Sequence, residues 1–140
     1  MDIFGDINYL LVLGTSLLSF FLGALWYSPI LFSNVWQKNV GLSDTDIQNG
    51  NMTVTMVGSF VCIAIMNLTL ALFLKKLELF ETVTYLQGGG VGLIVGLFFI
   101  FPSMAINMLY GQKPFSLLFI DAGYQTVYLT VAGILFGIWG

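Results

Sequence analysis

The sequence predicts an all-α integral membrane protein: a four-helix bundle with a short amphipathic interfacial helix between the first and second spans. Of the 140 residues, 58% are hydrophobic and only 8% are charged, whereas a soluble domain carries about 25% charged residues. The mean hydropathy is +0.94. The charges fall in short segments that separate four apolar runs, each with the length of a membrane span, about 18 residues or more.

The four spans are expected over residues 7–27, 52–74, 84–108 and 115–139. Each is long enough to cross a hydrocarbon core of about 30 Å at a rise of about 1.5 Å per residue. Backbone groups in lipid must be satisfied within the chain, so runs of this length favour a helical bundle over a barrel. Residues 1–140 then form a single four-span transmembrane domain, with both ends on the same side of the membrane.

The first span follows an acidic segment that contains Asp2 and Asp6, unlike the basic start of a secretory signal peptide, so we expect it to remain as a helix. It should end near Ser28, because the residue before a proline disfavours helical geometry. Ser28 and Pro29 are also typical of a helix start, with the serine as N-cap and the proline at the first helical position.

A short amphipathic helix is therefore predicted over residues 29–40. Phe32, Trp36 and Val40 recur at intervals of four residues, and Gly41 is suited to end the helix. A helix of this kind lies in the membrane interface with its apolar face towards the lipid.

The aromatic residues around this helix are interpreted as interfacial anchors, with a role in placement rather than in chemistry. Aromatic side chains are enriched where a chain leaves the hydrocarbon core. The four expected anchors are Trp26, Tyr27, Phe32 and Trp36. Ser43 and Asp46 lie three residues apart, a spacing that predicts the cap of one further short helix.

The lysines leave the orientation in the membrane open. The second span ends at Lys75 and Lys76, and the link that follows, residues 75–83, is short. Lys38 and Lys113 are expected on the other side of the membrane, so each side holds two lysines. An equal count does not decide the orientation by the positive-inside rule, although the adjacent pair hints at cytoplasmic chain ends.

Glycines recur at four-residue intervals in the last two spans. The third span contains Gly88, Gly92 and Gly96, and the fourth ends with Gly133 and Gly137. Small residues at this spacing let helix backbones approach closely in lipid. The stripes therefore predict helix packing, either within one subunit or between two subunits.

Two further positions within the spans carry local expectations. Pro102 should kink the third span and free a carbonyl near Phe98. Cys62 is the only cysteine, so it has no intramolecular partner, and we expect it to be a packed thiol.

Asp121 is the most informative polar position because it lies about two turns inside the fourth span. An ionised carboxylate near a helix centre costs on the order of 2.5–3.5 kcal/mol on insertion scales. It should therefore face protein or water, be protonated, or lie near the interface. Tyr124 and Gln125 share its helix face, and Asn67 and Asn107 are candidate partners from the other spans. This polar cluster is either a site for a proton, cation or polar substrate, or a structural knot that sets the helix register.

Composition also excludes several classes of function. The chain contains no histidine, which excludes histidine-ligated metal sites and histidine-based catalytic triads. We expect no metal centre and no cofactor. The net charge of −3 argues against a nucleic-acid partner, because nucleic acids favour basic surfaces.

A set of residues spread along the chain resembles a known family. The set is Gly23, Trp26, Tyr27, Ser28, Pro29, Phe32, Trp36 and Asn107, then Asp121, Ala122, Gly123 and Tyr124, and a glycine-rich last helix. It is similar to small bacterial membrane proteins grouped as domain of unknown function 1761. Members commonly have glycine where this chain has Ser33. The resemblance implies a multi-pass protein of the bacterial inner (plasma) membrane and brings no activity or catalytic residue with it.

Three classes of function remain open at this point. The leading one is a transporter or channel for an ion or small solute, with Asp121 at its centre. A bundle of 140 residues is small to enclose a pathway, so this role favours a homo-oligomer. The alternative is an accessory or scaffolding subunit that binds another membrane protein through the glycine stripes. A membrane-embedded enzyme is the least favoured, since acid–base chemistry would depend on Asp121 and Tyr124 alone.

Overall fold

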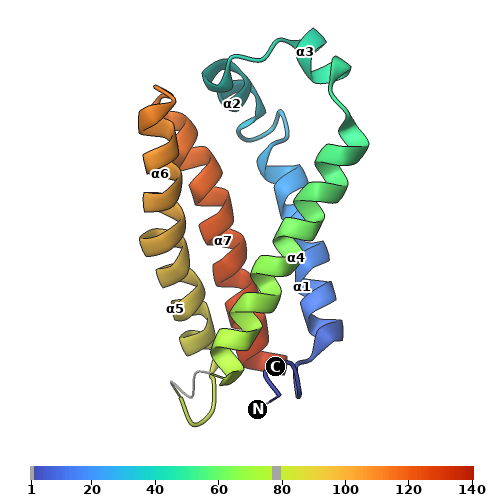
Figure 1. Cartoon of the computed structure of the whole chain (residues 1–140), viewed down its shortest axis with the longest axis vertical. Helices are drawn as coiled ribbons and strands as arrows, with labels where there is room; N and C mark the ends of the chain where they lie inside the picture. The colour runs from blue at the N-terminus through green and yellow to red at the C-terminus, as the bar shows by residue number, and fades with distance from the viewer. Residues whose placement is uncertain (1, 77–79) are drawn as a thin grey trace.

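Four long helical segments run along the molecule, and two short helices cover one end (Figure 1). The computed structural model describes residues 2–76 and 80–140. The long segments are α1 (Tyr9–Trp26), α4 (Met52–Lys76), a third made of α5 (Tyr85–Val95), η1 (Gly96–Ile100) and α6 (Phe101–Tyr110), and α7 (Phe115–Trp139). In the described part of the chain, these four segments are long and apolar enough to cross a membrane.

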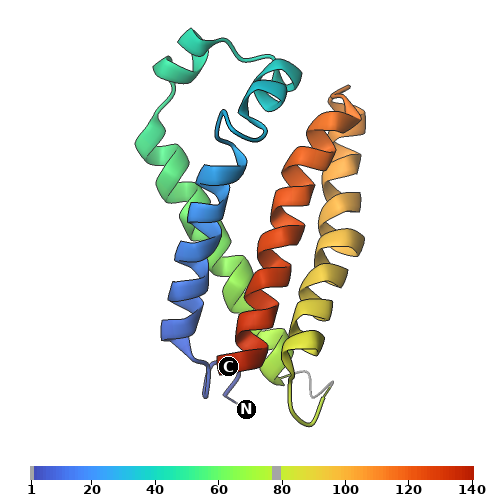
Figure 2. The ribbon, with the colours of Figure 1, turned by 180° about the vertical axis from the view of Figure 1, so that it is seen from behind.

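The predicted all-helical fold with four membrane-length helices is thus confirmed, and each segment begins and ends within two residues of the predicted span. Both ends of the chain lie at the end of the bundle opposite the short helices (Figures 1 and 2). The predicted short link over residues 75–83 includes residues 77–79, which lie outside the described residues.

Helix α7 is the centre of the bundle. It has α5 and α6 on one side and α1 and α4 on the other (Figures 1 and 2). Half of its most apolar stretch is buried within the chain, against 17–22% for the other three segments. Every other long segment therefore packs on α7.

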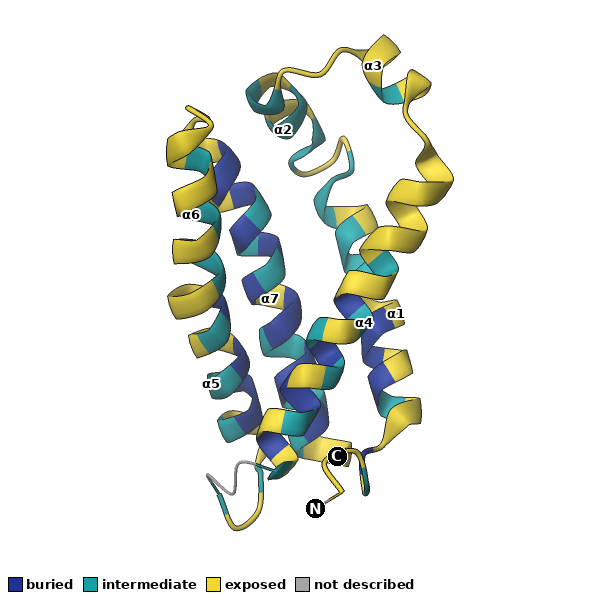
Figure 3. Ribbon diagram, in the orientation of Figure 1, coloured by how far each residue is buried: buried dark blue, intermediate teal, exposed yellow. Residues whose placement is uncertain are grey.

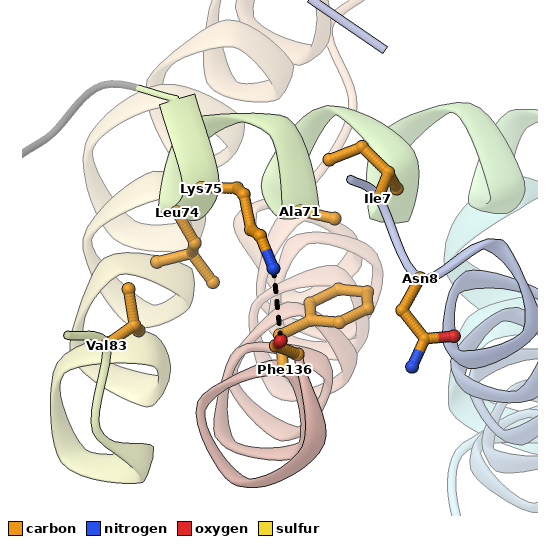
Figure 4. Close-up of a pocket in the computed structure, with 8 residues that line it drawn as sticks. Ile7, Asn8, Ala71, Leu74, Lys75, Val83 and Phe136 are labelled. Atoms are coloured by element: carbon orange, nitrogen blue, oxygen red, sulfur yellow. Dashed lines mark hydrogen bonds between the residues drawn. The ribbon is translucent and has the colours of Figure 1, made fainter. Parts of the chain in front are cut away.

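A lysine ties the end of α4 to the end of α7. The Nζ atom of Lys75 donates a hydrogen bond to the main-chain oxygen of Gly140 at 3.3 Å, beside the ring of Phe136 (Figure 4). A cation at the carboxyl end of a helix also complements the helix dipole. The bundle is closed at this end, where only a small cavity of about 40 Å³ remains.

Helices α5 and α7 approach each other backbone to backbone. A side chain at Gly88 would collide with the carbonyl group of Gly133, and one at Gly92 with the carbonyl group of Leu129. We call this contact the glycine seam. All five glycines of the predicted stripes lie at the contact between α7 and the segment formed by Thr84, α5 and η1. They are Gly88, Gly92, Gly96, Gly133 and Gly137. Both stripes thus pack within one chain, which is one of the two predicted arrangements.

The third long segment accommodates Pro102 through a π-helical turn. The N–H of Phe101 bonds to the carbonyl oxygen of Gly96, five residues earlier, just before the proline that cannot donate. The wider turn takes up one extra residue, which rotates α6 back by about 100° relative to a continuous α-helix. As a result, the side of α6 that carries Met104 still faces α7.

The first short helix begins later than predicted. Helix α2 spans Ser33–Val40, so the expected start at residue 29 is wrong. The hydroxyl of Ser28 donates to the carbonyl oxygen of Leu25 at 2.7 Å. Ser28 therefore bonds to the end of α1, and Phe32 occupies the N-cap position of α2. Gly41, with φ +79°, ends α2 as predicted.

Helix α3 (Asp44–Asn49) has the cap that the sequence predicts. Ser43 and Asp46 form a reciprocal capping box, with bonds of 2.9 and 3.1 Å between the side chain of each and the backbone N–H of the other. Together α2 and α3 form a roof over the end of the bundle (Figure 1).

Candidate functional site

An open cavity of about 830 Å³ lies under this roof, between α4 on one side and α6 and α7 on the other. Helix α4 diverges from α6 and α7 towards the roof (Figures 1 and 2). Side chains from α2, α3, α4, α6 and α7 and from the residue that follows α1 line the space. We call it the Asp121 cavity, because it contains the only charged side chain among the described residues that line it.

The carboxylate of Asp121 is held by a tyrosine from the other end of the chain. The hydroxyl of Tyr27, directly after α1, donates to Oδ1 of Asp121 at 2.7 Å, and both residues are half-buried. The predicted partners, Asn67 and Asn107, make no hydrogen bond with Asp121 among those the structure describes. That part of the prediction is wrong, because helix packing brings the end of α1 to the carboxylate instead.

Tyr27 also belongs to a row of four aromatic rings, which we call the aromatic wall. Trp36 of α2 meets Tyr27 with ring centroids 5.9 Å apart, and Tyr27 meets Tyr124 of α7 at 5.5 Å. Tyr124 in turn meets Tyr128 at 5.0 Å. Edge-to-face and tilted contacts at these distances are the favourable arrangements for aromatic pairs. The wall is therefore a connected structure that spans three elements.

The segment around residues 26–36 thus has a role that the sequence analysis missed. Trp26 donates its indole N–H to the carbonyl oxygen of Ile120 at 3.0 Å, and its ring lies 4.8 Å from that of Phe32. These contacts hold the segment on α7, one residue before Asp121. One sequence signal pointed this way: an intramembrane carboxylate with no lysine in any span needs a hydroxyl or N–H donor. The sequence contains six tyrosines, however, and does not say which one reaches it.

Asn67 belongs to a separate polar cluster at the α1–α4 contact. It is fully buried, and its Nδ2 atom donates to the hydroxyls of Ser16 and Ser19 at 3.4 and 3.3 Å. Its Oδ1 atom is buried without a hydrogen-bond partner. The hydroxyl of Tyr124 donates to the main-chain oxygen of Ser19 at 2.7 Å. Asn67 and Tyr124, which were predicted to lie in one polar cluster, are therefore linked only indirectly, since each of them bonds to α1.

The remaining predicted residues separate. Gln125 lines the cavity, where its Nε2 atom lies 3.7 Å from Sδ of Met104. Asn107 is exposed and stays outside the cavity. Cys62 is exposed and lines the cavity, so the expected packed thiol is wrong. The divergence of α4 leaves this part of the helix without a neighbour to bury it.

The sequence also matches a family over nearly its whole length. Residues 10–137 match the family described as "Protein of unknown function (DUF1761)". The chain belongs to the DUF1761 family. The matched range includes every described residue that lines the Asp121 cavity, and the match confirms the resemblance seen in the sequence. No curated protein and no solved structure matches this DUF1761 chain.

The charge of the cavity is unbalanced in this DUF1761 protein. The four lysines lie elsewhere. Lys75 bonds at the closed end of the bundle, and Lys113 donates to the main-chain oxygen of Val40 at 3.4 Å. The described residues contain no group of three or more cysteine, aspartate or glutamate side chains arranged to hold a metal ion. The Asp121 carboxylate thus faces the cavity with a hydroxyl as its partner and no cation beside it.

Proposed function

We propose that this DUF1761 protein is a non-enzymatic protein of the bacterial inner membrane that takes a small cation into the Asp121 cavity and carries it across the bilayer. One observation carries the proposal: Asp121 is the only charged side chain described on the wall of a cavity of about 830 Å³. A carboxylate in a low-dielectric site is costly, and its charge is best compensated by a cation. The cavity has room for that cation.

The hydroxyl of Tyr27 supports this role. A hydrogen bond from a neutral hydroxyl stabilises the carboxylate and fixes its position, but leaves its negative charge uncompensated. A lysine in the same place would have neutralised the site. Acid–base chemistry, by contrast, would need a second group free to exchange protons, whereas the hydroxyls of Tyr124 and Tyr128 are both engaged in hydrogen bonds. The arrangement therefore favours binding over catalysis.

The closed end of the bundle bears on how a cation would cross. Beyond Tyr128, buried apolar side chains from α4 and α7 fill the space towards the chain ends: Leu70, Ala71, Leu74, Leu129, Ala132 and Phe136. One chain therefore offers a cavity that opens from the roof half only. A complete path requires either a rearrangement of α4 or a second copy, and we propose a homo-oligomer.

The proposal is tested by flux into liposomes that contain the purified protein. The cations to be supplied are H⁺, Na⁺, K⁺, methylammonium and tetramethylammonium. At least one should enter faster than in protein-free liposomes, and Asp121→Asn should abolish that excess. The asparagine keeps an oxygen that can accept from Tyr27, so the fold should be retained. Glu81→Gln, which also removes one exposed negative charge, is the matched control and should leave the flux unchanged. Absence of flux for every cation, or equal flux in Asp121→Asn, contradicts the proposal.

A further inference from the structure

We infer that the cation accepted by the Asp121 cavity is an organic ammonium ion with apolar substituents, such as a quaternary alkylammonium, and not a hydrated metal ion. This inference rests on the proposed role of Asp121 and specifies the class of ligand. It depends on three features of the cavity: its rings, its engaged hydrogen-bond donors and its apolar side.

The aromatic wall places π systems beside the carboxylate. Trp36, Tyr27, Tyr124 and Tyr128 succeed one another at 5.0–5.9 Å between ring centroids, and all four line the cavity with Asp121. A quaternary ammonium ion has no N–H to donate, so it is recognised by aromatic rings together with a carboxylate. A small hydrated metal ion instead requires several oxygen ligands at close range.

The tyrosine hydroxyls on this wall already donate hydrogen bonds within the chain. Tyr27 donates to Asp121, Tyr124 to the main-chain oxygen of Ser19 at 2.7 Å, and Tyr128 to Sδ of Met66 at 3.0 Å. The wall therefore presents ring surfaces and leaves few donors for an anion.

Three polar side chains of α2 and α4 at the cavity, those of Gln37, Thr55 and Ser59, are engaged in the same way. The hydroxyl of Ser59 donates to the main-chain oxygen of Thr55 at 2.6 Å. The hydroxyl of Thr55 donates to the main-chain oxygen of Asn51 at 3.1 Å, and the side-chain amide of Gln37 donates to the carboxylate of Asp44 at 2.7 Å. The polar side chains thus satisfy one another or the backbone, which suits a ligand that makes few hydrogen bonds.

The side of the cavity opposite the roof is apolar. Ile63 and Met66 of α4 and Met104 of α6 line it, and thioethers adapt to substituents of different shape. A second cavity of about 490 Å³ lies between α1 and α4 and shares Tyr27 and Tyr124 with the Asp121 cavity. These volumes suit an organic molecule, since pockets for such ligands measure about 300–1,000 Å³.

The chain carries its own reporter for a test. Cys62 is the only cysteine, is exposed, and lines the Asp121 cavity. We suggest labelling it in lipid nanodiscs with methanethiosulfonates that carry either a trimethylammonium or a sulfonate group. After correction for their rates with a free thiol, the cationic reagent should react at least ~10-fold faster, because a local negative potential concentrates cations. Asp121→Asn should remove most of this ratio, and Glu81→Gln should keep it.

Protection by an added ligand then distinguishes organic from inorganic cations. Tetraethylammonium chloride should slow the labelling of Cys62 by a neutral methanethiosulfonate, whereas NaCl or KCl at the same ionic strength should not. This comparison uses the unmodified chain, so it holds even where Asp121→Asn fails to fold. Equal labelling by the two charged reagents, or protection by NaCl as strong as that by tetraethylammonium, overturns the inference.

The outcomes separate the inference from the proposed function. Asp121-dependent flux of Na⁺ or K⁺ without protection by tetraethylammonium would refute the organic ligand and keep the transport role. Selective protection with no flux of any cation would keep the ligand class and refute transport.

Discussion

The two sides of α7 are packed in opposite ways. Towards α5, the glycine seam brings two backbones into contact, and a side chain at Gly88 or Gly92 would have no room. Towards α1 and α4, the same helix presents the large rings of Tyr124 and Tyr128, which line the Asp121 cavity. Figure 3 shows α7 buried or half-buried along most of its length, while the half of α4 nearest the roof is exposed.

The difference shows how one apolar helix can both close a bundle and open it. Small residues give close contact where no water or ligand can enter. Large tyrosine rings can line an open space without leaving a polar group unpaired when their hydroxyls bond to other residues of the chain. In this protein the closed side holds the fold, and the open side carries Asp121, the one carboxylate within the four helical segments of membrane length.

The largest expected effect comes from filling the glycine seam. Gly92→Leu should lower the stability of the bundle strongly, by about 3 kcal/mol or more, because its side chain would meet the backbone of Leu129. Gly90→Leu is the matched control on the same helix, since a Cβ atom there meets no atom within 4 Å. Unfolding of both variants by sodium dodecyl sulfate in mixed micelles measures the difference. Equal stability of the two variants would show that the seam is not a close backbone contact.

A smaller effect is expected at the contact between α1 and α4. Asn67→Leu removes two long hydrogen bonds to Ser16 and Ser19, but also removes an unpartnered buried oxygen. Bonds between membrane helices average about 0.6 kcal/mol, while an unsatisfied buried group costs about 1–3 kcal/mol, so the net change should be below about 1 kcal/mol. The same unfolding assay applies, with the exposed Thr69→Val as control. A loss above about 2 kcal/mol would identify Asn67 as the polar knot that holds the open side in place.

The smallest effect concerns the roof of the open side. Hydrogen bonds from the backbone N–H and then from the side chain of Ser43 hold the pKa of Asp46 below its usual range. A lowered folded pKa means that the capping stabilisation of α3 is present above the unfolded value of about 3.9 and is lost as the pH falls through the folded value. An NMR titration of the Asp46 carboxyl carbon measures this midpoint. Ser43→Ala should raise it only in part, because the backbone bond remains; a midpoint in the usual range in the parent chain would contradict the capping box.

The features that were predictable from the sequence are those whose signals are local. The lengths of the spans, the capping box at Ser43 and the end of α2 at Gly41 all follow from patterns within a few residues. The glycine stripes predicted a close helix contact, although not whether it lies within one chain. The start of α2 was predicted wrongly, since Ser28 can serve either the end of one helix or the start of the next, and the structure uses it for the former.

The open side was less predictable because its residues come from distant parts of the chain. The sequence by itself determined that four apolar helices form and that one carboxylate lies inside the last of them. Only the tertiary structure decided that Tyr27, 94 residues earlier, meets Asp121 and that Asn107 stays outside. The physical reason is that a local pattern specifies which residues avoid water, whereas the rotation and tilt of each helix depend on all its neighbours. Here the glycine seam fixes which face of α7 packs on α5, and the face that carries Tyr124 and Tyr128 lines the Asp121 cavity.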